Sequence, residues 1–272
     1  MSSIEHYKKH LLPFFESYFK TSNFQNLEAY LITNSNLPSP RGNLELAKVF
    51  ADLVEDNSRN QREKLWQLCS EFVKITAEQA PTNDPKEFIP FCGADGIGAI
   101  GSVSPQYFKQ ALLIMKMQAN DSRWRMREGV CFGLQRLMAG HGMAVIEQFE
   151  EWLDNATLLE LRAIAGSVAD PPLLKDNKLA NAALALHKEI FKKVLIIADR
   201  KSENFRILRK ALGFTLSVVV SAIPEPGFNF MHQLANSKDA DIRWILKENL
   251  KKNRLIKNFP EQVESLKKLL EK

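Results

Sequence analysis

The sequence lacks the features that disulfide-rich, membrane-spanning and β-sheet proteins require. Its three cysteines, Cys69, Cys92 and Cys131, are too few and too scattered for a disulfide framework or a zinc site. No apolar run reaches the ~18 residues of a membrane helix, because serine, threonine and glycine interrupt even the longest weakly polar stretch, 212–223. No segment of useful length alternates as a half-buried strand does. These absences favour an all-α protein without membrane contact.

Metal and cofactor sites are not indicated either. His6 and His10 could share one helix face, but no third ligand accompanies them. Gly96, Gly98 and Gly101 have the spacing of a dinucleotide-binding loop, which needs a preceding strand where this sequence is helical. We therefore predict no metal and no cofactor. The first ten residues are charged where a signal peptide would be apolar, so we expect a cytoplasmic protein.

Helix signals, in contrast, are present throughout the chain. Of the 272 residues, 45% are hydrophobic, which is enough for a sizeable core. Asp84-Pro85 has the residues of a helix start, and Thr157 with Glu160 has the spacing of a capping box. The patterns predict helices near 3–19, 24–33, 43–56, 59–79, 86–100, 104–119, 121–139, 141–153, 156–169, 177–198, 202–222, 227–236, 239–252 and 260–271.

Part of this helical pattern recurs. Residues 121–128 (DSRWRMRE) and 241–248 (DIRWILKE) share Asp, Arg, Trp and Glu, and a fifth position is basic in both. Their offset of 120 residues is three times the period of about 40 that is typical of HEAT and armadillo units. Residues 203–211 fit as an intermediate unit, and a weaker match surrounds Arg162.

The repeat predicts an all-α, right-handed α-α superhelix of the HEAT/armadillo type, with about six to seven helix pairs. We expect a single α-solenoid domain over 1–272, with a divergent helical part over 1–80 and HEAT-like repeats over 81–272. In this arrangement an aspartate caps the second helix of a unit, and a basic residue six positions later reaches a partner in a neighbouring unit. The residues predicted for this structural ladder are Asp121, Arg127, Asp241 and Lys247.

Residues 121–136, 203–220 and 241–255 resemble an uncharacterised bacterial HEAT-repeat family. The resemblance covers about the last 150 residues. The fold of that family is similar to that of the alkylpurine DNA glycosylases built on HEAT-like helix pairs, and residues 203–218 also look like a stretch of those enzymes. The resemblance implies a basic, concave DNA-binding groove. The catalytic aspartate of those enzymes corresponds to no position that we can assign here, and Trp124 and Trp244 are predicted to be core aromatics of the repeat.

Positive charge is concentrated in the second half of the chain. Residues 1–120 contain 12 basic and 13 acidic residues, whereas 121–272 contain 25 and 19. Within 199–257 there are 12 basic and 6 acidic residues. Helical spacing places two groups of these bases on common faces, where they could bind a partner or the phosphates of a nucleic acid. The candidate binding residues are Arg206, Arg209, Lys210, Lys247, Lys251 and Arg254.

Two functions remain open. The first is a non-enzymatic HEAT-repeat scaffold that binds a protein or peptide partner on its curved surface. The alternative is a nucleic-acid-binding protein related to DNA alkylation repair, which as a glycosylase would need a carboxylate at the glycosidic bond. Four aspartates are available for that role, but spacing alone assigns none of them and no catalytic residue is predicted: Asp121, Asp199, Asp239 and Asp241.

Overall fold

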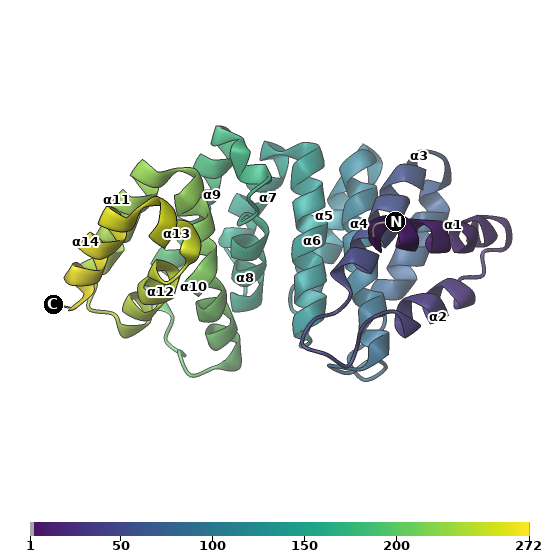
Figure 1. Ribbon diagram of the computed structural model, residues 1–272, viewed down its shortest axis with the longest axis horizontal. Coiled ribbons are helices and arrows are strands. Elements are labelled where there is room, and N and C mark those ends of the chain that lie inside the picture. Colours follow the sequence, from purple (N-terminus) through teal and green to yellow (C-terminus); the bar gives the residue numbers. More distant parts are fainter. Residues whose placement is uncertain (1–2, 272) are drawn as a thin grey trace. The chain divides into compact units, whose positions relative to one another are not determined.

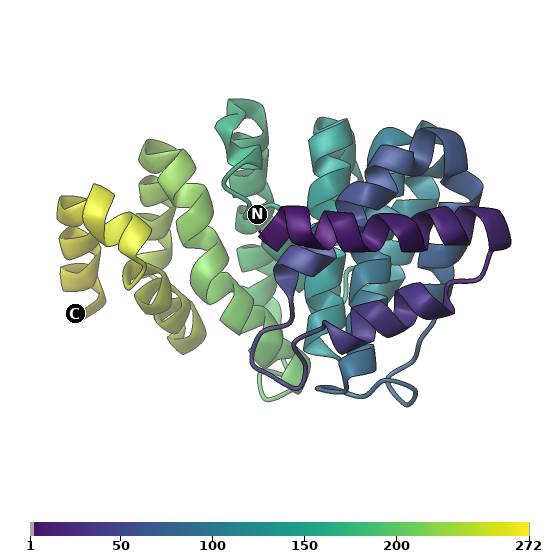
Figure 2. The ribbon, with the colours of Figure 1, turned by 45° about the vertical axis from the view of Figure 1, so that its right-hand side comes forward.

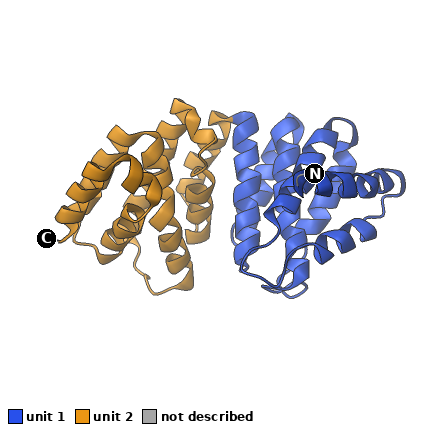
Figure 3. Cartoon of the chain, viewed as in Figure 1, with its two compact units in different colours: residues 1–141 blue, residues 142–272 orange. Residues whose placement is uncertain are grey.

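The computed structural model describes residues 3–271, which form α-helices joined by short loops and, over that range, no strand. The chain divides into two compact units, residues 1–141 (unit 1) and 142–272 (unit 2) (Figure 3). Within each unit, successive helices lie side by side as stacked layers (Figure 1). The all-α class and the helical-repeat type of fold are therefore confirmed.

Unit 1 is built around a central helix. It contains α1 (Ser3–Thr21), α2 (Gln25–Thr33), α3 (Leu44–Val73), the 3₁₀ turn η1 (Pro85–Glu87), α4 (Phe88–Val103), α5 (Pro105–Gln118) and α6 (Trp124–His141). Helix α4 packs against α3 on one side and α6 on the other, and nearly all of its residues are buried. Helix α1 lies across this layer and packs on α3 (Figure 2).

Close packing of α4 depends on the glycines that resemble a dinucleotide loop in sequence. A Cβ atom on Gly98 would lie 2.3 Å from the backbone of Gly133 in α6. A Cβ atom on Gly101 would lie 2.6 Å from the side chain of Leu137. The glycine spacing thus serves a helix–helix contact, and the segment is helical throughout, as predicted.

Unit 2 consists of eight α-helices and one 3₁₀ turn over the described residues 142–271. They are α7 (Met143–Leu153), α8 (Leu158–Ser167), the 3₁₀ turn η2 (Leu173–Lys175), α9 (Asn177–Ile196), α10 (Glu203–Ala222), α11 (Pro224–Ala235), α12 (Ala240–Leu250), α13 (Asn253–Asn258) and α14 (Pro260–Glu271). Helix α10 is the central element, because it packs against α8, α9, α11, α12 and α13. The predicted capping box of Thr157 and Glu160 begins α8.

The largest departures from the predicted helices lie around α3 and after α12. Helices expected over 43–56 and 59–79 are one helix, α3, kinked at Gln61, which has non-helical backbone angles. The segment after α3 is not helical because the buried Arg123 guanidinium binds its carbonyls, at 2.8 Å for Ile75 and 3.2 Å for Thr76. Helix α13 was not predicted. The single domain over 1–272, with its division at residue 80, stays a prediction.

The contact between α4 and α6 predicts a large effect of one methyl group. Gly98→Ala is expected to lower the free energy of unfolding by about 3 kcal/mol, because a backbone cannot retreat as a side chain can. Urea unfolding followed by circular dichroism measures the change. Gly42→Ala is the control, since its Cβ would meet Phe88 at an ordinary 3.7 Å. Equal midpoints for the two variants would contradict this account of the packing.

Candidate functional site

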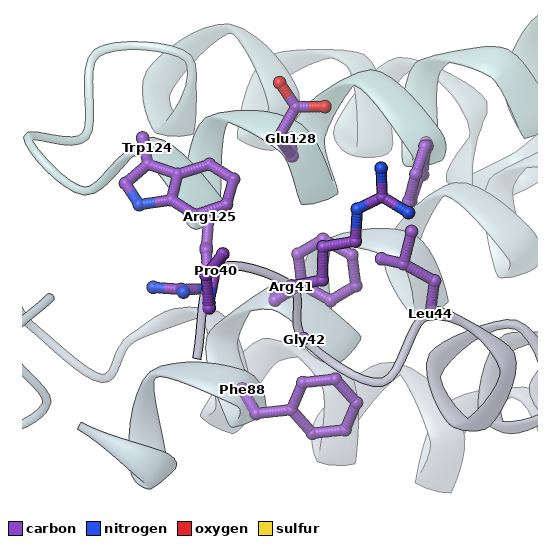
Figure 4. A pocket seen from close by; sticks show the side chains of 10 residues that line it. Pro40, Arg41, Gly42, Leu44, Phe88, Trp124, Arg125 and Glu128 are labelled. Atoms are coloured by element: carbon purple, nitrogen blue, oxygen red, sulfur yellow. The ribbon is translucent and has the colours of Figure 1, made fainter. Parts of the chain in front are cut away.

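Unit 1 contains a cavity of about 310 Å³, here called the aromatic pocket (Figure 4). The loop before α3, the start of α4 and the first two turns and a half of α6 contribute its walls. Most of the lining is apolar. The volume of the cavity is near the lower end of the usual range for ligand pockets. The lining residues are Pro40, Arg41, Gly42, Leu44, Phe88, Phe91, Trp124, Arg125, Glu128 and Phe132.

A buried ion pair holds the walls of the aromatic pocket together. Arg125 Nη1 donates to Glu87 Oε2 at 2.8 Å, and the Glu87 side chain is completely buried. The other arm of the guanidinium, Nη2, donates to the Ser39 carbonyl at 2.5 Å. Arg125 therefore joins α6, the start of α4 and the loop. Because the Arg125 charge is paired with Glu87, Arg125 orders the wall of the pocket without adding a free charge to it.

Trp124 forms one side of the aromatic pocket and is 41% exposed. The Arg125 guanidinium carbon lies 4.3 Å from the centre of its ring, a cation–π contact that orients the indole. Phe88 lies on the opposite side of the loop in Figure 4 and is buried. The exposed, oriented indole offers an apolar side chain a flat surface, and the Phe88 ring belongs to the lining of the same cavity.

A second, more open cavity of about 580 Å³, here called the polar pocket, lies on the other side of the same loop residues. Its lining includes Tyr7 and three asparagines, and it shares Arg41, Gly42 and Leu44 with the aromatic pocket. Arg41, Gly42 and Leu44 therefore form a ridge between the apolar aromatic pocket and the polar pocket.

Unit 2 contains a cavity of about 400 Å³ between α10 and α12, here called the basic pocket. Three of the six basic residues predicted from the sequence line it, and two aromatic side chains accompany them. The lining residues are Arg206, Arg209, Lys210, Gly213, Phe214, Trp244, Glu248 and Lys252.

Arg209 and Trp244 form the structured wall of the basic pocket. The Arg209 guanidinium carbon lies 4.0 Å from the centre of the Trp244 ring. Its Nε is 3.0 Å from Asp241 Oδ1, an ionic contact in which the N–H does not point at the oxygen. Gly213 leaves room for the indole, since a Cβ there would lie 3.3 Å from Trp244. Arg209 is thus oriented and partly neutralised.

The remaining bases differ in their partners. Lys210 and Lys252 form no ion pair within residues 3–271, and Arg206 has only a loose exposed pair with Glu203 at 3.4 Å. Lys251 is turned to Glu248, at 2.5 Å. These contacts leave the basic pocket with net positive charge.

The other predicted binding residues do not line a described pocket. Lys247 and Arg254 are exposed, and neither they nor Lys251 lines the basic pocket. Lys252, one position beyond Lys251, does line it. Lys247, Lys251 and Arg254 were expected on one helix face, but α12 ends at Leu250 and Arg254 belongs to α13, so they do not share one helix. A binding role for the six basic residues stays a prediction.

The predicted ladder residues have contacts of a different kind from those expected. Asp121 accepts from the Arg123 backbone N–H at 2.7 Å and pairs with the Arg123 guanidinium, also at 2.7 Å. Arg127 donates to the carbonyls of Asp121 and Ser122 at 2.7 and 2.8 Å, within its own turn. Lys247 is exposed and makes no ion pair in the described range. A ladder repeated along the chain stays a prediction.

In the second copy of the repeat, a different aspartate caps the helix. Asp239 accepts from the N–H groups of Asp241 and Ile242 and is the N-cap of α12. Partial burial alone would raise the pKa of Asp239, but hydrogen bonds from Arg200 and the cap amides hold it below its usual range. Asp241 instead pairs with Arg200 and Arg209, at 3.0 Å in each case. The prediction that Asp241 is the cap was therefore wrong.

The candidate acids for glycosylase chemistry are engaged in structure. Asp121, Asp239 and Asp241 are all in ion pairs with arginine. Asp199 is exposed and accepts from the N–H groups of Lys201 and Ser202 in the turn before α10. No catalytic role is assigned to any of them.

The prediction that Trp124 and Trp244 are core aromatics of the repeat is wrong, because both line cavities. Trp124 lines the aromatic pocket and Trp244 the basic pocket, and in each case the glutamate four positions later, Glu128 or Glu248, lines the same cavity. The recurring Trp-x-x-x-Glu pattern could have indicated this, because residues four apart share a helix face. Both glutamates are only partly buried, and a charged residue on the same face as the indole is unusual for a core-facing side of a helix.

Within the described residues 3–271, no helix is long and apolar enough to cross a bilayer, and no three His, Cys, Asp or Glu side chains are grouped as metal ligands. All three cysteines are buried thiols, and burial raises the pKa of Cys69 and Cys92.

No protein-family model and no curated protein matches the chain. Among solved structures, it is similar to a designed armadillo repeat protein at 11% identity and a TM-score of 0.29, covering 82% of this chain and 98% of that protein. The helical-repeat description rests on the helices described above. The resemblance to HEAT-like DNA glycosylases stays a prediction.

The Arg125–Glu87 pair should make a measurable contribution to the stability of unit 1. Glu87→Gln is expected to lower the free energy of unfolding by about 3 kcal/mol or more, because it leaves the buried Arg125 charge without its partner. Urea unfolding provides the measurement. The control is Glu28→Gln, which removes the partly exposed 3.8 Å pair with Lys86 and should cost under about 1 kcal/mol. Similar losses for both variants would refute the claim.

Proposed function

We propose that the protein is a non-enzymatic helical-repeat scaffold that binds a partner protein by taking an apolar or aromatic side chain into the aromatic pocket of unit 1. The observation that carries this proposal is the exposed Trp124, oriented by Arg125 at the wall of a cavity that Phe88 also lines. A cavity that is largely apolar, with a few fixed polar groups, is the usual form of a binding site.

The energetics of such a site favour a protein segment. A partly exposed tryptophan loses the remaining water from its ring when a ligand side chain covers it, and aromatic anchors of this kind dominate binding energy at interfaces. Since Arg125 is already committed to Glu87 and Ser39, the wall does not need to reorganise on binding. The cavity volume suits one side chain of a partner, whose other contacts would lie along the surface.

Binding of a simple aromatic peptide tests the proposal. Saturation-transfer difference NMR should detect transfer from the full-length protein to the phenyl protons of acetyl-Gly-Ser-Phe-Ser-Gly-amide. Trp124→Ala should weaken binding about 10-fold or more, because it removes one wall of the cavity. Leu113→Ala, which truncates another exposed apolar side chain of unit 1, should leave the signal unchanged. Equal signals from Trp124→Ala and the unaltered protein would contradict the proposal.

A second candidate function is nucleic-acid binding through the basic pocket. Its support is that Arg206, Arg209 and Lys210, which the sequence analysis selected, line one cavity together with Trp244 and Phe214. Unpaired lysines attract phosphates, and exposed rings stack on bases. This combination is typical of surfaces that bind single strands without strong sequence preference.

The salt dependence of DNA binding tests this second candidate. Fluorescence anisotropy with a short labelled oligonucleotide between about 50 and 200 mM salt gives the slope of log affinity against log salt. Lys210→Ala with Lys252→Ala should reduce the slope by about two units if each lysine contacts a phosphate. Lys267→Ala with Lys268→Ala removes the same charge outside the pocket and should change it little. If the two double variants have the same slope of log affinity against log salt, the basic pocket is excluded as the phosphate site.

A further inference from the structure

The ridge between the aromatic and polar pockets carries an unpaired cation. Arg41 is exposed, lines both cavities, and makes no side-chain ion pair or hydrogen bond within residues 3–271. Its backbone is nevertheless fixed, because the Arg41 carbonyl accepts from Asn36 Nδ2 at 2.9 Å and from Ser39 Oγ at 2.7 Å. The free guanidinium therefore extends from an ordered position.

The other charged groups of the two cavities are placed differently. Arg125 is paired with Glu87, so it offers no free charge to a ligand. Glu128 lines only the aromatic pocket and Glu45 only the polar pocket. Arg41 alone among these side chains borders both cavities. A ligand that crosses the ridge meets the Arg41 guanidinium next to the aromatic pocket.

We infer that the aromatic pocket recognises a peptide segment in which an aromatic or large apolar side chain is next to a carboxylate, with the side chain in the pocket and the carboxylate on Arg41. This inference rests on the proposed function and specifies in addition that the partner carries an acidic residue beside its apolar one. Arg41 lines the aromatic pocket itself, and consecutive Cα atoms of a peptide are about 3.8 Å apart, so the residue next to the one in the cavity lies close to the ridge. Guanidinium–carboxylate pairing then selects the acidic neighbour.

The test compares three peptides on the ¹⁵N-labelled full-length protein. The host is acetyl-Gly-Ser-Phe-Asp-Ser-Gly-amide, and the other two replace its Asp with Asn or its Phe with Ala. The protein has four tryptophans, so its indole N–H signals are few, and Trp124→Phe and Trp244→Phe assign the two that matter. Shifts of the Trp124 signal give the dissociation constant at the aromatic pocket, and the Trp244 signal reports binding at the basic pocket.

The Phe-Asp peptide should bind about 3- to 10-fold more tightly than the Phe-Asn peptide, as a single partly exposed charge pair allows. In Arg41→Gln the two peptides should bind equally, whereas Arg41→Lys should keep part of the preference. Arg59→Gln is the control, since Arg59 is an exposed base of the same unit that lines neither pocket. Arg59→Gln should leave the full preference.

The possible failures separate the two proposals. If both Phe peptides shift the Trp124 signal with equal affinity, or if the preference survives in Arg41→Gln, the carboxylate inference is overturned and the aromatic pocket still binds peptides. An Asp-dependent shift confined to Trp244 also overturns the inference, because the acid is then bound in unit 2. If no Phe peptide shifts the Trp124 signal, the proposed function fails, and the inference fails with it.

Discussion

The aromatic pocket depends on the ion pair between Arg125 and Glu87. The pair is buried, so each charge has lost its water and requires the other. The same guanidinium binds the Ser39 carbonyl and supports the Trp124 ring. One side chain therefore fixes the loop that carries Arg41, the start of α4 and the exposed indole. A binding site of this kind is formed before its ligand arrives, and little conformational entropy remains to be lost on binding.

The two units use one repeated pattern for two kinds of cavity. Trp124 and Trp244 match in the repeated sequence pattern, although Trp124 begins α6 and Trp244 lies in the second turn of α12. Each indole has an arginine over its ring. In unit 1 that arginine is buried and paired with Glu87, and the surrounding lining is aromatic. In unit 2 Arg209 is partly exposed, is paired with Asp241 and has Lys210 and Lys252 in the same lining. Each copy of the sequence pattern thus contributes an indole to a cavity, and the residues packed around that indole determine whether the cavity suits an apolar side chain or an anion.

The sequence was sufficient to predict the helical fold, because caps and apolar periodicity are local signals. Thr157 and Glu160 show this, since their spacing alone identified the start of α8. The aromatic pocket could not be predicted, because the contact between Arg125 and Ser39 joins segments 86 positions apart. The basic pocket was found in part: Arg206, Arg209 and Lys210 share one helix, whereas Lys252 enters from the turn after α12. A count of basic residues also treats Arg125 and Arg209 as free charges, whereas in the structure each is paired with an acidic side chain.

The most direct test of the account is a crystal structure of the full-length protein with the Phe-Asp peptide. A preformed aromatic pocket predicts the phenyl ring in the cavity lined by Trp124 and Phe88, the peptide carboxylate on the Arg41 guanidinium, and an Arg125–Glu87 pair at its present 2.8 Å. A peptide bound elsewhere, or a loop that must open and break the Arg125 contact with Ser39 before the ring enters, would contradict a preformed aromatic pocket.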